Sequence, residues 1–276
     1  MVWRVPEGGH FMSQAGIAGM RQAAQDIFDV VETFDAADWH APSAANGWSA
    51  KDVVTHVGSL LEDLVAAVSQ QPLPDMGIEA LNDLQVTERR HLSGPEAIAF
   101  VKEQLGSALD AFEPLQVEPV ASSEVPMLDL GSYPLHAIAD MFTFDMATHL
   151  RYDILAPRGP IVRHVAALDE VVLAPSVAWL LGGIPKMQPT LATAVDGPLA
   201  LELTGPGGRD VVVDVTDGVV TVVSAADAGI DPIATISSTT ADFLAWSTRR
   251  TDWRNAATIA GDHAAAQHFL DTLNLI

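Results

Sequence analysis

Residues 199–225, LALELTGPGGRDVVVDVTDGVVTVVSA, decide the fold class of this chain. Apolar and polar residues alternate in three short runs, a period that predicts β-strands. The runs are separated by Pro206-Gly207-Gly208 and by Asp217-Gly218, two sequences that are typical of hairpin turns. We therefore expect an antiparallel sheet here.

The segments on either side of these strands complete a predicted C-terminal domain. Val165 to Leu181 has a helical pattern, and Gly182-Gly183 is a typical helix stop after it. After the strands we expect four more elements: a strand at 234–236, a capped helix at 239–248, a short strand at 257–259 and a final helix at 262–273. The sequence thus predicts an α+β domain over residues 161–276, with 165–181 as its linking helix.

The first half of the chain has a different pattern. Apolar residues recur at helical spacing in four long segments, with Ser49 and Ser93 as N-cap signals for the second and third: 16–32, 49–70, 93–112 and 135–155. A weaker helical pattern covers residues 78–91. Four such segments joined by loops predict a four-helix bundle over residues 13–160, so the fold class is α+β in two domains.

Charge and composition exclude several classes of function. The 276 residues include 14 Lys plus Arg and 36 Asp plus Glu, a net charge of −22. Such a chain has no general basic face for nucleic acid or for an acidic membrane surface. No apolar run is long enough for a membrane span, and the start, MVWRVPEGGHFMSQ, lacks signal-peptide features. We expect a cytoplasmic monomer, with translation from Met1 or from Met12.

The chain contains no cysteine. It can therefore form no disulfide and no thiolate metal site, and it has no cysteine nucleophile. Any sulfur chemistry must use a thiol that comes from outside the chain.

Histidine and aspartate residues provide a candidate metal site. Asp145 and His149 are four residues apart, which places both on one face of the predicted helix about 6 Å apart. His56 lies in another predicted helix and could supply a third ligand, leaving one position open as in catalytic zinc sites. On spacing alone, a buried core or cap histidine and a chance pair are the more common explanation of such residues. Asp153 could hold the His149 ring, although a helix-end carboxylate is the simpler interpretation.

Three segments of the chain resemble the mycothiol-dependent maleylpyruvate isomerase family. They are NGWSAKDVVTHVGSLLEDL at 46–64, FDMATHLRYDILAPRG at 144–159 and DFLAWSTRRTDWRNAATIAGDHAAAQHFLDTL at 242–273. The resemblance implies a DinB-like four-helix domain followed by an α+β domain similar to sterol-carrier folds.

The resemblance also implies a site and its cofactors. The metal ligands would be His56, Asp145 and His149, with Asp at a position where the family more often has Glu. Zinc is the expected metal, with nickel, cobalt or iron as alternatives, and mycothiol is the expected thiol cofactor. Eleven of the fourteen basic residues are Arg, as in high-G+C bacteria in which mycothiol would be available.

The activity implied by the resemblance is the addition of a metal-bound thiolate to a small electrophile. In a cis-trans isomerase the adduct rotates and the thiolate leaves again, whereas an S-transferase keeps the new bond. The sequence does not separate these two reactions.

The resemblance further implies a catalytic arginine in the second domain. Arg250 fits this position best and Arg249 is the alternative, while Arg254 could bind a carboxylate of the cofactor. These arginines could equally belong to a solvated helix end and pair with Asp242 or Asp252.

Two functions from other classes remain open at this stage. The second domain could enclose an apolar ligand, with the helical domain as a metal-stabilised scaffold. Alternatively, the acidic surface could dock a partner protein, although net charge relates to solubility more than to activity.

Overall fold

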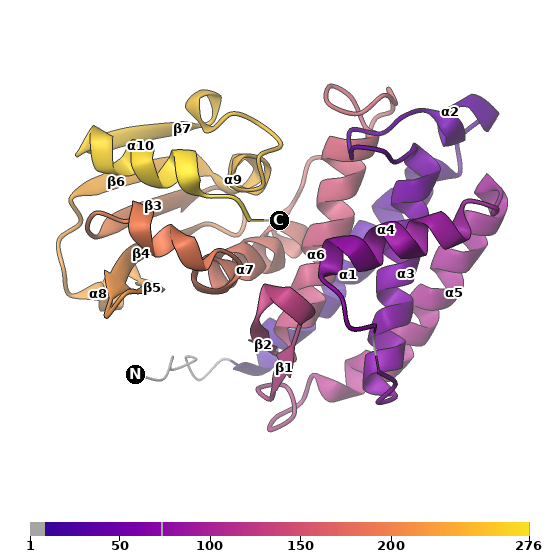
Figure 1. Ribbon diagram of the computed structural model, residues 1–276, viewed down its shortest axis with the longest axis horizontal. Helices are drawn as coiled ribbons and strands as arrows, with labels where there is room; N and C mark the ends of the chain where they lie inside the picture. The colour runs from indigo at the N-terminus through magenta and orange to yellow at the C-terminus, as the bar shows by residue number, and fades with distance from the viewer. Residues whose placement is uncertain (1–8, 73, 276) are drawn as a thin grey trace. The chain divides into compact units, whose positions relative to one another are not determined.

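A computed structural model describes the backbone of residues 9–72 and 74–275, and the side chains from Gln14 onward. The chain divides between Ala167 and Leu168 into two compact units. The first unit is mainly helical and the second contains the main sheet (Figure 1). This order confirms the predicted α+β fold class. Residues 1–8, which include Met1, one of the two candidate start positions, lie outside the described residues.

Four long helices build the helical unit: α1 (Gly9–Val31), α3 (Ala50–Val68), α5 (Gly94–Phe112) and α6 (Ala137–Thr148). Helix α3 packs against α5, and α1 packs against α6 (Figure 1). The core between them contains fully buried apolar side chains, among them Met20, Ile27, Leu61, Phe112 and Met146. Helix α6 continues directly into a π-helical turn, η3 (His149–Ile154).

Local capping explains why two of these helices begin where the sequence predicts. The Ser49 side chain accepts a hydrogen bond from the backbone N–H of Asp52, and the Asp52 carboxylate accepts one in return from the Ser49 N–H. Ser93 and Glu96 form the same reciprocal pair at the start of α5. Such capping boxes satisfy backbone donors that have no partner within the helix.

The helical unit also contains shorter elements, most of which the sequence did not indicate. Asp35 caps a five-residue helix, α2 (Ala36–His40), and two short strands pair antiparallel before α6. Helix α4 (Ile78–Arg89) corresponds to the weak helical pattern and packs against α3. The remaining elements are η1 (Glu113–Leu115), β1 (Glu124–Pro126), η2 (Leu128–Leu130) and β2 (Ser132–Pro134).

The second unit is built on a five-stranded sheet with the strand order β5-β4-β3-β6-β7. Strands β3 and β6 are parallel and the other neighbours are antiparallel. The strands are β3 (Leu199–Thr204), β4 (Arg209–Thr216), β5 (Val219–Ser224), β6 (Ala234–Thr239) and β7 (Ala257–Gly261). The three strands and the two hairpin turns predicted in residues 199–225 are all present. Asp217 and Gly218 both have positive φ, as a tight two-residue turn requires.

Buried residues of the strands form the core of the second unit, and burial alternates most clearly along β6 and the second half of β3. Leu199, Leu201 and Leu203 are buried, whereas Glu202 and Thr204 between and after them are exposed. The sheet strands contact helices α7 (Glu170–Met187), α9 (Thr240–Ser247) and α10 (His263–Thr272). The remaining short elements are η4 (Pro189–Ala194), α8 (Ala225–Ala228) and η5 (Trp253–Asn255).

Helix α7 departs from the sequence prediction at both ends. It begins at Glu170 behind the N-cap Asp169 and continues through Gly182 and Gly183 to Met187. The predicted stop at Gly182-Gly183 was therefore wrong. Ile184 beyond the two glycines is fully buried. Burial of such a side chain contributes about 1.5–3 kcal/mol, which offsets a cost of roughly 1 kcal/mol for each glycine inside the helix.

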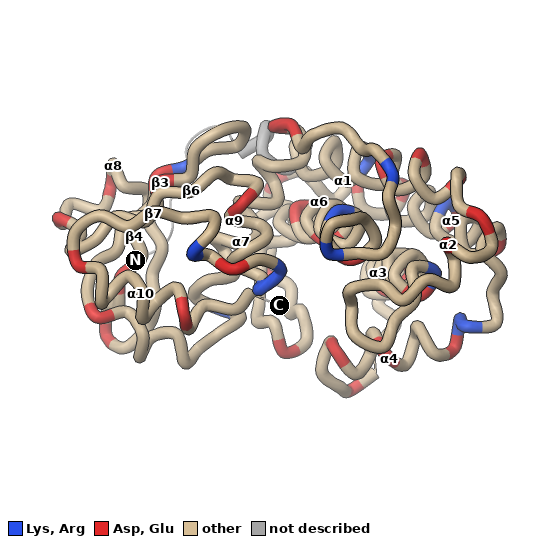
Figure 2. The backbone as a smooth tube through the Cα atoms, turned by 90° about the horizontal axis from the view of Figure 1, so that it is seen from above, with Lys and Arg blue, Asp and Glu red and all other residues tan. Residues whose placement is uncertain are grey.

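None of the described helices is both long and apolar enough to span a lipid bilayer. Acidic positions outnumber basic ones along the backbone of both units (Figure 2).

Candidate functional site

Helix α3 carries His56 into the interior of the helical unit. The first ten residues of α3, from Ala50 to Ser59, are all buried, so this helix runs through the core from its first turn. The His56 side chain is 3% exposed. A histidine this deeply buried has lost most of its contact with water and needs a polar or charged partner inside the protein.

Helix α6 and the π-helical turn that follows supply that partner. Asp145 lies in the last turn of α6, and His149 is the first residue of η3. Their side chains are 16% and 12% exposed. Short π-helical turns are often found at functional sites, because they re-aim side chains within an otherwise regular helix.

The structure brings these three side chains together. Oδ1 of Asp145 lies 3.3 Å from Nε2 of His149 and 3.7 Å from Nε2 of His56. One ligand atom from each of the three residues lies within 4.8 Å of the other two. The structure thus brings together the two residues of one helical segment and the one residue of another helix that the sequence indicated.

The pKa values of Asp145 and His149 depend on each other's charge. Burial alone would lower the pKa of His149, but the carboxylates of Asp145 and Asp153 outweigh it and raise this pKa to about 9. Burial alone would raise the pKa of Asp145, but His149 and His56 hold it well below its ordinary value. Without a bound cation, Asp145 is therefore ionised and His149 is protonated near neutral pH.

The donor set fits a small divalent cation. In a tetrahedral site with bonds of about 2.0–2.1 Å, two donor atoms are about 3.3 Å apart, close to the two separations measured from Asp145. The second carboxylate oxygen of Asp145, Oδ2, is buried and has no hydrogen-bond partner among the described residues. Two imidazoles and one carboxylate are ligands that zinc and other transition metals accept.

Trp48 forms one wall of this site, which the sequence analysis did not predict. Its indole ring lies 4.9 Å from the His56 ring and 6.5 Å from the His149 ring, centroid to centroid. Its Nε1–H donates a hydrogen bond of 2.9 Å to Oδ1 of Asp83 on α4. In the sequence, Trp48 stands directly before the capping residue Ser49. No spacing rule relates a residue in this position to a histidine in the helix that follows.

Asp153 and Arg158 lie behind His149. Nδ1 of His149 is 2.8 Å from Oδ2 of Asp153, and the Arg158 guanidinium forms an ion pair with the other oxygen of Asp153. Asp153 is 1% exposed. The interpretation of Asp153 as a simple helix-end carboxylate was therefore wrong, because its carboxylate contacts the imidazole and is buried.

In the second unit, the three predicted arginines line one pocket of about 410 Å³ together with Trp246 and Trp253. Arg249 has a φ of 58°, an unusual backbone conformation for a residue other than glycine. Arg254 pairs with both carboxylate oxygens of Asp271, at 2.9 and 3.1 Å, and stacks on Trp253. Of the two partners considered from sequence, Asp252 pairs with Arg254. The Asp242 carboxylate instead accepts a hydrogen bond from the hydroxyl of Thr239, the N-cap of α9, and the pairing with Asp271 was not predicted.

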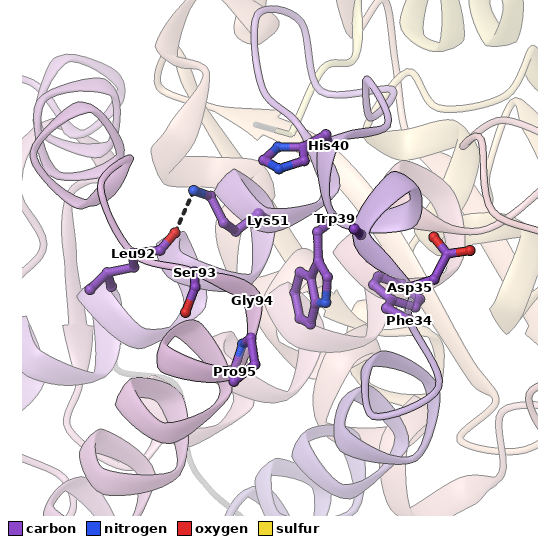
Figure 3. Close-up of a pocket in the computed structure, with 10 residues that line it drawn as sticks. Phe34, Asp35, Trp39, His40, Lys51, Leu92, Ser93, Gly94 and Pro95 are labelled. Atoms are coloured by element: carbon purple, nitrogen blue, oxygen red, sulfur yellow. Dashed lines mark hydrogen bonds between the residues drawn. The ribbon is translucent and has the colours of Figure 1, made fainter.

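A second cavity, of about 350 Å³, lies between α2 and the N-terminus of α5 in the helical unit (Figure 3). Lys51 and His40 line it beside the ring of Trp39. The Lys51 ammonium donates to the carbonyls of Arg90 and Leu92, at 2.7 and 2.6 Å, in the segment that follows α4. Lys51 thus serves to fix the end of α4.

The comparisons with known proteins agree with this architecture. A crystal structure of a mycothiol-dependent maleylpyruvate isomerase matches 93% of this chain and 93% of its own, with a TM-score of 0.57 and 16% sequence identity. A structure of a variant of that enzyme, with one histidine replaced by alanine, matches with a TM-score of 0.55 over the same shares and at the same identity. At this identity the matches establish the fold.

Of the two sequence comparisons, one finds a match, and it lies in the helical unit. A search of curated proteins finds no significant match. Residues 20–151 match the family model described as the mycothiol maleylpyruvate isomerase N-terminal domain, a range that contains His56, Asp145 and His149. The helical unit, which contains these residues, therefore belongs to the mycothiol maleylpyruvate isomerase N-terminal domain family.

Proposed function

We propose that this protein is a metal- and mycothiol-dependent enzyme that acts on a small electrophile, either as a cis-trans isomerase or as a thiol S-transferase. The observation that carries the proposal is the buried cluster of His56, Asp145 and His149 within the matched family domain. The chain itself has no cysteine, so the reacting thiol comes from the cofactor.

His56, Asp145 and His149 would hold the cation through Nε2, Oδ1 and Nε2. A divalent cation held there would act as a Lewis acid and lower the pKa of a coordinated thiol, so that the thiolate is available at neutral pH. Zinc is the proposed metal, and nickel, cobalt or iron would accept the same donors. Three protein ligands leave room for one ligand from outside the chain.

The neighbouring side chains limit the access of water. Trp48 covers the two imidazoles on one side and is tied to α4 through Asp83. A site with little water strengthens the electrostatic interactions inside it and protects a reactive thiolate from protonation.

Arg250 is proposed to hold carboxylate charge on the substrate, with Arg249 as the alternative and Arg254 as a contact for a carboxylate of the thiol cofactor. All three line one pocket, and a guanidinium can bind a carboxylate through two parallel hydrogen bonds. Arg254 also pairs with both carboxylate oxygens of Asp271, so a cofactor carboxylate would compete with Asp271 for this guanidinium.

Binding of an apolar ligand in the second unit receives less support from the structure. The side chains that face the helices from the sheet, such as Leu201 and Ile236, are fully buried, as are Phe243 and Phe269 on the helices. Side chains therefore fill the space that such a ligand would need.

Metal analysis combined with thiol titration tests the proposed function. We expect the purified protein to bind one divalent metal ion per chain and to bind mycothiol only when that metal is present. His149→Ala and His56→Ala should lose both properties while keeping their helical circular dichroism. A wild-type protein without stoichiometric metal, or an His149→Ala variant with unchanged metal content and thiol binding, would show that the proposal is wrong.

A further inference from the structure

The two histidines of the cluster differ in what holds their second ring nitrogen. Nδ1 of His149 lies 2.8 Å from Oδ2 of Asp153. Nδ1 of His56 is buried and has no hydrogen-bond partner among the described residues. Within the cluster, the His149 ring is therefore the one whose orientation a carboxylate can fix.

Asp153 is itself held in place from several sides. Its Oδ1 forms an ion pair with Arg158, and the same guanidinium donates to the Tyr152 carbonyl at 3.2 Å. The backbone carbonyl of Asp153 accepts a 2.8 Å hydrogen bond from the N–H of Ala44. A carboxylate with one oxygen on each partner has little freedom to rotate away from the imidazole.

The chain returns over the π-helical turn to bring Arg158 to this position. Backbone hydrogen bonds join Ile161 N to Ile154 O at 3.1 Å and Ala156 N to Ile161 O at 2.8 Å. Between them, Gly159 lies so close to the turn that an added Cβ would be 2.3 Å from the carbonyl carbon of Ile154. Only glycine permits this approach, because backbone atoms cannot move aside as a flexible side chain can.

We propose that residues 155–161 form a clamp that acts through Arg158 and Asp153 on His149 and keeps Nε2 of that imidazole directed at the cation. This inference rests on the proposed metal site and assigns it two positioning residues. Asp153 holds the proton on Nδ1, which leaves the lone pair of Nε2 free to bind metal. A carboxylate behind a ligand histidine also raises the basicity of the ligand, and its removal typically costs 10–100-fold in metal affinity.

The dissociation constant for Co²⁺, measured by competition with a chelating dye, tests the clamp. We expect Asp153→Ala to weaken Co²⁺ binding by about 10–100-fold. Arg158→Met, which leaves the carboxylate in place, should weaken it less, and Gly159→Ala should weaken it because the loop is displaced. In the Zn²⁺-loaded protein, the NMR signal of the His149 Nδ1 proton should be protected from exchange in wild type and lost in Asp153→Ala.

Asp26→Asn provides a matched control. Asp26 pairs at 2.7 Å with Arg151, which belongs to the same π-helical turn, and both side chains are largely buried. This variant removes a buried ion pair of the turn without touching a ligand, so its Co²⁺ affinity should stay within about twofold of wild type. If Asp153→Ala does not fold, Asp153→Asn keeps the side-chain shape and Arg158→Met keeps the buried carboxylate.

Each outcome distinguishes the clamp from the proposed function. A wild-type protein that binds no divalent metal overturns the proposed function and the clamp together. If the wild type binds Co²⁺ and the Asp153 and Arg158 variants bind it as tightly, the clamp alone is overturned. Equal losses in Asp26→Asn and Asp153→Ala would also overturn it, since the effect would then come from general loosening of the turn.

Discussion

The indole ring of Trp48 lies 4.9 Å from the imidazole of His56 at an angle of 51°. A paramagnetic ion bound by that imidazole would quench the fluorescence of so close an indole. We expect Co²⁺ to quench part of the tryptophan emission of the wild type and Trp48→Phe to lose most of this quenching. Trp39→Phe, on α2 of the same unit, should keep it. Equal quenching in wild type and Trp48→Phe would mean that Co²⁺ binds elsewhere.

Asp145 is the proposed ligand that lies close to both histidines, so its charge should matter most. Asp145→Asn keeps the size of the side chain but removes the charge that attracts the cation and the two imidazoles. In the wild type, metal at 100 times its dissociation constant should raise the free energy of unfolding by about 2.7 kcal/mol. We expect little or no such increase in Asp145→Asn, measured by chemical denaturation with and without Zn²⁺. An undiminished increase would exclude Asp145 as a ligand.

The raised pKa of His149 predicts how metal binding depends on pH. The proton that His149 holds below about pH 9 must leave before Nε2 can bind a cation. Metal affinity should therefore rise by about tenfold per pH unit between roughly pH 7 and 9 and then level off. Isothermal titration in buffers of different ionisation enthalpy should detect about one released proton at pH 7. A flat affinity over this range would contradict the prediction.

The same pKa has the opposite consequence for the stability of the metal-free protein. Because the folded-state pKa lies above the ordinary value of 6.5, the contribution of protonated His149 is complete below about pH 6.5 and is lost as the pH rises through about 9. Urea denaturation in the presence of a chelator should show this decline in wild type. His149→Gln should lack it.

Asp63 on α3 is expected to make a second, smaller contribution to pH dependence. Burial is the main cause that raises the pKa of Asp63 to about 6, against a hydrogen bond from Gln85 that lowers it. The stability that this group provides is complete below about pH 3.8 and is lost as the pH rises through about 6. Asp63→Asn should thus be more stable than wild type at pH 8, by no more than about 1 kcal/mol because Asp63 is partly solvated. The two proteins should converge near pH 4.

Arg250→Lys tests the proposed substrate contact. Lysine keeps the charge but cannot form two parallel hydrogen bonds to a carboxylate, so kcat/KM should fall by about 10–100-fold. Metal content and thiol binding should be unchanged. A matching Arg254→Lys variant should lose less activity toward the substrate, because Arg254 is proposed to contact the cofactor. A larger loss in Arg254→Lys would reverse the assignment.

The start of a helix could be predicted from sequence where its signal is local. The capping boxes at Ser49 and Ser93 need only residues within one turn, and α3 and α5 begin where these signals predict. Asp35 forms the same kind of box, but α2 is only five residues long and has too few positions to show a helical period. The end of α7 depends on burial of Ile184 against distant residues, which local glycine signals cannot reveal.

For the candidate site, too, the residues that could be predicted are those with a signal in the local sequence. Asp145 and His149 could be identified because their spacing of four residues lies within one helix. His56 could be named as a third ligand from its place in another predicted helix, and the family resemblance then supported all three. Trp48 and Arg158 could not be identified, because each reaches the site from a loop, and no periodic spacing rule describes the path of a loop. For Arg158 that path depends on the close approach of Gly159 to Ile154.

The π-helical turn from His149 to Ile154 has a further consequence for the lengths of related chains. A π-helical turn holds about one residue more than an α-helical turn, so it corresponds to a single-residue insertion in a helix. Deleting one residue from 150–152 would let the α-helical ladder continue in place of the π-helical turn. Asp153 would then stand three residues after His149 instead of four, a spacing that still places both side chains on one face of an α-helix. Related sequences can therefore be sorted by the number of residues between these two positions, which a comparison of residue identities alone would not reveal.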